Sequence, residues 1–127
     1  MLFLVDTSVL IDHLRGDERA VGRLRAAVEA GDELWSATVV RTEILAGARA
    51  PEEAAIIELL DRLRWMEITV EVADAAGRLA ARYLRSHPGV DTVDYLIAAC
   101  AAQLDAALLT LNVRHFPMFP DLEPAYR

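Results

Sequence analysis

The sequence predicts an α/β fold with three layers, in which helices cover both faces of a central parallel sheet. Short apolar runs alternate with longer amphipathic segments along the whole chain, and this order is typical of parallel sheets. The chain has 127 residues, of which 54% are hydrophobic, so it can bury a real core and is not disordered. No repeat or linker divides it, and residues 1–127 are expected to form a single domain.

Four short segments are predicted to be the strands of this sheet. The first, LFLV, is apolar at every position, as expected for a strand that is buried on both faces. The predicted strands are residues 2–5, 32–37, 65–70 and 106–111.

Six segments with helical patterns separate these strands. Gly16 and Gly31 end the first two helices, Asp17 is placed to cap the second, and Pro51 opens the fourth. A His-Pro-Gly turn at residues 87–89 stops the fifth. The predicted helices are residues 7–16, 18–30, 38–50, 51–64, 71–86 and 91–104, followed by a proline-rich loop at 112–127.

Composition and charge restrict the class of protein. No apolar run is long enough to span a membrane, and the start of the chain lacks the basic region of a signal peptide, so a cytoplasmic protein is expected. The single cysteine, Cys100, is expected to pack as a small hydrophobe. The net charge of −7 argues against broad binding to nucleic acid, although all thirteen basic residues are arginine, which suits phosphate contacts.

Asp6 directly follows the first strand, which places it at a carboxyl end of the sheet, where open α/β sheets bind ligands. A buried carboxylate there needs partners, which could be helix N–H groups, an arginine or a metal ion. The alternative is that Asp6 only caps the following helix.

Two further acids are candidates for the same place. Glu43 falls on or beside the apolar stripe of its helix, with the small residues Ala46 and Gly47 next to it. Asp91 and Asp94 stand three positions apart at a helix start, where Asp91 can act as the N-cap. Asp94 then has less need of a structural role, although both acids could simply complement the helix dipole.

Asn112 follows the last strand by two positions and belongs at the same edge of the sheet. Together with Asp6, Glu43 and Asp94 it would form a cluster of oxygen ligands drawn from four segments. A hard divalent cation usually relieves the repulsion in such a cluster, and oxygen ligands favour Mg²⁺, for which Mn²⁺ can substitute. A Mg²⁺ ion held in this way suits phosphoryl chemistry.

Four stretches of the sequence resemble the PIN-domain ribonucleases, and more narrowly the VapC-type toxins of bacterial toxin–antitoxin pairs. The stretches are LVDTSVLIDHLRG, SATVVRTEILAGA, DYLIAACA and LLTLNVRHF, in family order and, with the segments between them, over almost the whole chain.

The resemblance implies a PIN-like α/β/α domain and a metal-dependent endoribonuclease that leaves a 5′-phosphate and a 3′-hydroxyl. It implies that Asp6, Glu43 and Asp94 are the family's three acids. It further implies that Ser8 is the hydroxyl residue beside the first acid and that Thr110 is the threonine that ends the strand of the last motif. It also implies a homodimer and a VapB-like antitoxin that inhibits the toxin through a peptide segment placed in the acidic site.

Asn112 departs from many relatives, which have an aspartate as a fourth acid. The amide removes one negative charge, so we expect one firmly held Mg²⁺, with any second ion arriving with the RNA. Asp91 could contribute to the site in part. Arg41 and Arg114 could reach phosphates of the RNA, although each could equally be a partner in a surface ion pair.

Two other functions compete with the nuclease. A phosphatase of the haloacid dehalogenase type also begins with a strand and an aspartate, but it needs a second acid where this chain has Ser8. The alternative from another class is a catalytically weak module that binds RNA or protein without turnover.

Overall fold

The computed structural model describes residues 1–127 and confirms the predicted α/β class. Its sheet has four parallel strands in the order β3-β2-β1-β4, so β1 lies inside the sheet and pairs with both β2 and β4. The strands are β1 (Leu2–Val5), β2 (Glu33–Ala37), β3 (Arg64–Met66) and β4 (Ala107–Leu109).

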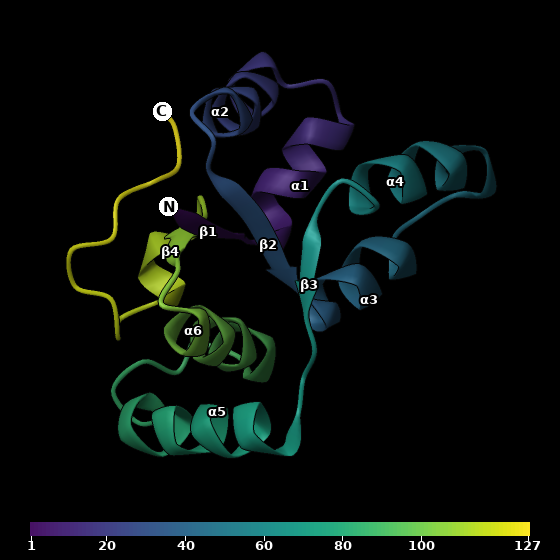
Figure 1. The fold of residues 1–127 in the computed structure, drawn as a ribbon. Helices are drawn as coiled ribbons and strands as arrows, with labels where there is room; N and C mark the ends of the chain where they lie inside the picture. The colour runs from purple at the N-terminus through teal and green to yellow at the C-terminus, as the bar shows by residue number, and fades with distance from the viewer.

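Helices cover both faces of this sheet. Figure 1 shows α1 and α2 on one side of the strands and α5 and α6 on the other. Helix α6 packs directly on three strands, and α5 lies against α6 as an outer layer. The α-helices are α1 (Thr7–Leu14), α2 (Glu18–Glu29), α3 (Thr38–Ala46), α4 (Glu53–Leu60), α5 (Val70–Tyr83) and α6 (Thr92–Leu104).

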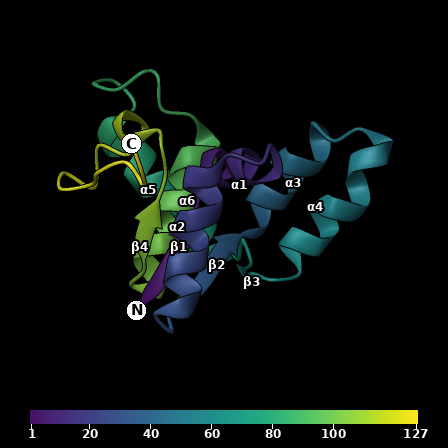
Figure 2. The ribbon, with the colours of Figure 1, turned by 90° about the horizontal axis from the view of Figure 1, so that it is seen from above.

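The remaining elements complete the chain. Helices α3 and α4 lie together at one end of the molecule, with α3 next to α1 (Figure 2). Two short 3₁₀ helices, Ala50–Glu52 and Val113–His115, precede α4 and follow β4. No helix combines the length and the apolar character that crossing a membrane requires.

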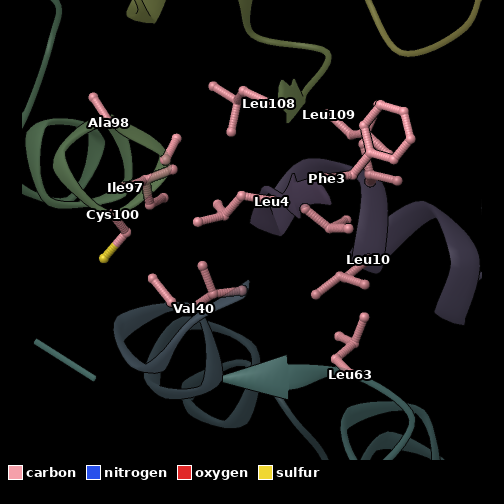
Figure 3. Packing of buried hydrophobic residues seen from close by; sticks show 14 of the residues in the cluster. Phe3, Leu4, Leu10, Val40, Leu63, Ile97, Ala98, Cys100, Leu108 and Leu109 are labelled. Carbon is pink, nitrogen blue, oxygen red and sulfur yellow. The ribbon is translucent and has the colours of Figure 1, made fainter. Parts of the chain in front are cut away.

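The core lies on both faces of β1. Leu4 and Val5 are fully buried, and Phe3 nearly so, which explains why this strand is apolar at every position. The side chain of Leu4 extends towards Ile97 of α6 (Figure 3). Cys100 of α6 is fully buried as well, and burial raises the pKa of its thiol to about 11. Cys100 therefore packs as a hydrophobe, as the sequence predicted.

Several predicted elements end earlier than expected. The predicted strand 106–111 ends at Leu109, and the predicted helix 51–64 ends at Leu60, with Arg64 already in β3. The strand predicted over residues 65–70 ends at Met66, because Met66 pairs with Ala37, the last residue of β2. Thr69 then caps α5, with its hydroxyl accepting a hydrogen bond from the Val72 N–H. The helix predicted over residues 38–50 ends at Ala46, with Gly47 as its C-cap.

Tyr95 of α6 is buried, but its hydroxyl has no hydrogen-bond partner within the chain. An unpaired buried hydroxyl costs about 1–3 kcal/mol, so Tyr95→Phe should raise the free energy of unfolding by about 1 kcal/mol in urea denaturation. Tyr126→Phe is the matched control, because the hydroxyl of Tyr126 donates to Asp12 Oδ2 at 2.6 Å. This second change should lower stability by about 1–2 kcal/mol. A loss of stability in Tyr95→Phe would show that its hydroxyl has a partner.

Candidate functional site

Asp6 stands between the end of β1 and the start of α1. Its Oδ2 accepts hydrogen bonds from Ser8 Oγ at 3.0 Å and from Thr110 Oγ1 at 2.7 Å. Its side chain makes no capping hydrogen bond to the backbone of α1. The alternative that Asp6 only caps this helix is therefore wrong, and its partners are the two hydroxyls that the resemblance singled out.

The hydroxyls that hold Asp6 are themselves held by the backbone after β4. Ser8 Oγ accepts the N–H of Leu111 at 3.1 Å, and Thr110 Oγ1 accepts the N–H of Asn112 at 3.0 Å. Because each hydroxyl accepts from an N–H group, its own proton is free to donate to the carboxylate. The segment after β1 and the segment after β4 thus meet at Asp6 and fix its orientation.

Asp94 lies in the first turn of α6 and shares a capping box with Asp91. The Asp94 N–H donates to Asp91 Oδ1 at 3.0 Å, and the Asp91 N–H donates to Asp94 Oδ2 at 3.1 Å. Asp91 is the N-cap, as predicted, and its side chain is exposed. Asp94 is buried, and its carboxylate accepts the Asp91 N–H. Asp94 therefore has a structural role in the capping box, for which less need was expected from the sequence.

The electrostatics of Asp94 connect it with the first acid. Burial is the largest cause that raises the pKa of Asp94 to about 6. The hydrogen bond from the Asp91 N–H lowers this pKa and the charge of Asp91 raises it, while His115 lowers it and the charge of Asp6 raises it. The two carboxylates that lie 88 positions apart in the sequence (94 − 6) therefore influence one another in the fold.

Glu43 reaches the same region from α3. Its Oε1 accepts a hydrogen bond from Thr7 Oγ1 at 2.6 Å, and Thr7 is the neighbour of Asp6 in the chain. Glu43 is exposed, so it lies at the solvent edge of its helix rather than within the apolar stripe. Its contact with Thr7 still joins α3 to the start of α1.

The three acids share one property that matters for metal binding. In each carboxylate one oxygen accepts hydrogen bonds from the chain, and the other has no hydrogen-bond partner. The unpartnered oxygens are Asp6 Oδ1, Asp94 Oδ1 and Glu43 Oε2. No three acidic, histidine or cysteine side chains form a ready metal cluster. The donor set nevertheless fits Mg²⁺, since it consists of anchored carboxylates with free oxygens.

Asn112 and the two arginines occupy different surroundings. Asn112 is exposed and contributes its backbone N–H to Thr110, while its side-chain amide makes no hydrogen bond. The guanidinium of Arg41 lies over the ring of Trp65 at 4.7 Å from the centroid. Arg114 is exposed and forms no ion pair within the chain.

Sequence reasoning missed two residues beside the acids. His115 Nδ1 lies 3.4 Å from Asp94 Oδ2, although no spacing in the sequence relates the two. Thr7 holds Glu43 across 36 positions, and its place next to Asp6 was the one signal that could have identified it.

Comparison with known proteins identifies the family of this chain. The family model of the PIN domain matches residues 3–119. Ribonuclease VapC19 of Mycobacterium tuberculosis is 50% identical over 123 residues, which cover 97% of this chain and 98% of that protein. Ribonuclease VapC10 of the same organism is 42% identical over 125 residues, covering 98% of this chain and 93% of the relative.

Solved structures share the fold at lower identity. VapBC2 from Rickettsia felis has a TM-score of 0.82 at 18% identity, over 96% of both chains. VapBC from Salmonella typhimurium has a TM-score of 0.80 at 22% identity, covering 98% of this chain and 97% of the other. With a family model that spans nearly the whole sequence and relatives at 42% and 50% identity, this chain belongs to the PIN-domain family and, within it, to the VapC type.

Proposed function

We propose that this protein is a Mg²⁺-dependent endoribonuclease toxin that hydrolyses RNA phosphodiester bonds and is neutralised by a VapB-like antitoxin. The observation that carries the proposal is the arrangement of Asp6, Glu43 and Asp94. Each is held through one carboxylate oxygen and keeps the other without a hydrogen bond. The name ribonuclease, which the relatives from Mycobacterium tuberculosis carry, supports RNA as the substrate.

The chain's own residues prepare the site for this reaction. Ser8 and Thr110 fix Asp6, the Asp91 N–H fixes Asp94, and Thr7 fixes Glu43. Asp6 and Asp94 would hold the metal ion, with Glu43 contributing directly or through a water molecule. When bound, Mg²⁺ orients a water, promotes loss of its proton and offsets the negative charge that develops on the phosphate. Anchored ligands lose little freedom on binding, which favours a preorganised site.

The proposed partners follow from the similar structures and from the family. VapBC assemblies are the structural neighbours of this chain, which supports a VapB-like antitoxin. A homodimer is part of the same proposal, and light scattering of the purified protein would measure it.

Chelation tests the proposed activity directly. Purified protein incubated with total RNA should cut it in the presence of Mg²⁺, lose this activity in EDTA, and regain it when excess Mg²⁺ or Mn²⁺ is added. Mapping the new 5′ ends identifies the sites of cleavage. A protein that shifts RNA in a gel but never shortens it with either metal would instead be the catalytically weak binding module.

A further inference from the structure

A small polar cleft lies beside Asp94. It has a volume of about 340 Å³ and is lined by His87, Gly89, Val90, Arg114 and His115. These residues come from the turn before α6 and from the 3₁₀ helix after β4. Only Val90 among them has an apolar side chain, so the cleft is unsuited to a hydrophobic ligand.

The cleft and the acidic site share their boundary. His115 lines the cleft, and its Nδ1 lies 3.4 Å from Oδ2 of Asp94. Val90 directly precedes Asp91, the N-cap of α6. A chain-like ligand that is bound at Asp94 can therefore continue into the cleft without leaving the surface.

The three polar side chains in the cleft are nitrogen donors with few partners in the chain. Arg114 is exposed, forms no ion pair in the chain and offers several N–H donors. His87 Nδ1 is 2.8 Å from Ser86 Oγ, and its ring makes an edge contact with Tyr83 at 5.7 Å. Each imidazole is thus positioned through Nδ1, while its Nε2 has no hydrogen-bond partner in the chain.

The negative charge of the protein opposes RNA binding near these donors. The chain has a net charge of −7, and three carboxylates stand at the proposed reaction centre. Both features repel the RNA backbone, so binding needs positive charge and hydrogen-bond donors close to the acids. A phosphate has enough acceptor oxygens for several donors at once, and a guanidinium can bind it through two parallel hydrogen bonds.

We infer that this cleft binds a backbone phosphate of the RNA next to the phosphodiester that is cut, with Arg114 as the principal contact and His87 and His115 beside it. The inference rests on the proposed function, which makes RNA the ligand at Asp94. It deepens that function by placing a specific anchor for the RNA outside the acidic site.

The test compares Arg114→Gln with Arg78→Gln, a matched control on α5. Arg78 is also exposed and forms no ion pair in the chain, but it lies outside the cleft. Binding of a single-stranded oligouridine of about twelve nucleotides is measured in EDTA by fluorescence anisotropy at several salt concentrations. Arg114→Gln should weaken binding about fivefold and reduce the magnitude of the salt slope by about 0.7, the value for one lost phosphate contact on a single strand.

Arg78→Gln should leave both quantities at the wild-type value, and His87→Gln should weaken binding in the same direction as Arg114→Gln. Equal salt slopes in Arg114→Gln and wild type would overturn the inference. So would a wild-type protein that does not bind the oligouridine, or an Arg114→Gln variant that binds RNA normally and fails only to bind an acidic protein partner. Failure of the nuclease proposal is separate, because it would appear as absence of cleavage with Mg²⁺.

Discussion

Asp94→Asn is expected to reduce RNA cleavage by a factor of about 100 or more while the fold survives. The substitution removes the negative charge from a carboxylate whose Oδ1 has no other partner. The remaining carbonyl oxygen of asparagine can still accept the Asp91 N–H, so the start of α6 stays closed. Cleavage rates with saturating Mg²⁺ and thermal unfolding followed by circular dichroism measure the two halves of this expectation.

Asp91→Asn is the control for this experiment. Asparagine is as good an N-cap as aspartate, so we expect a stability change below about 1 kcal/mol and cleavage close to that of the wild type. Full activity of Asp94→Asn would remove Asp94 from the reaction centre. A loss of cleavage in Asp91→Asn that equals the loss in Asp94→Asn, with the fold intact, would transfer the role to Asp91.

Thr110→Val should lower the free energy of unfolding by about 2–3 kcal/mol and also reduce cleavage. Thr110 is fully buried, and its hydroxyl both donates to Asp6 Oδ2 and accepts the N–H of Asn112. Valine has a similar shape but no polar atom, so a buried charged oxygen and a backbone N–H each lose a partner. Urea denaturation gives the stability change, and a cleavage assay with Mg²⁺ gives the loss of activity.

Thr110→Ser distinguishes the hydroxyl from the methyl group. Serine keeps the hydroxyl and removes one methyl group, which should cost only about 1 kcal/mol and preserve most of the cleavage. If the valine and serine variants were equally stable and equally active, the hydrogen bond to Asp6 would have no role in holding the carboxylate.

Most helices and strands could be predicted because their signals are local. The continuous apolar run of β1, the Asp17 cap of α2 and the Asp91 cap of α6 are confirmed. The errors concern where elements end, and the clearest of them depends on a neighbouring strand. The strand at β3 stops early because β2 offers no residue beyond Ala37 to pair with, and the sequence of β3 itself carries no sign of this.

The candidate site could be predicted only in part. Asp6 and Asp94 were identifiable because burying a carboxylate at a strand end or beside a buried helix face is costly unless it has polar partners or binds a metal ion. The bonds that hold Asp6 could not be predicted from spacing alone, since Thr110 lies 104 positions away. The contact between His115 and Asp94 also depends on where the segment after β4 folds back.

The hydrogen bonds from Ser8 and Thr110 clamp the carboxylate of Asp6, and this clamp can form only late in synthesis. The ribosome makes β1 and Asp6 first, whereas Thr110 and the backbone that holds both hydroxyls are made only after α6 and β4. Pairing between segments so distant in sequence forms late in folding. A nascent chain therefore carries an unclamped first acid until β4 has emerged and docked against β1. The proposed ribonuclease site would therefore be complete only after β4 has docked, near the end of synthesis.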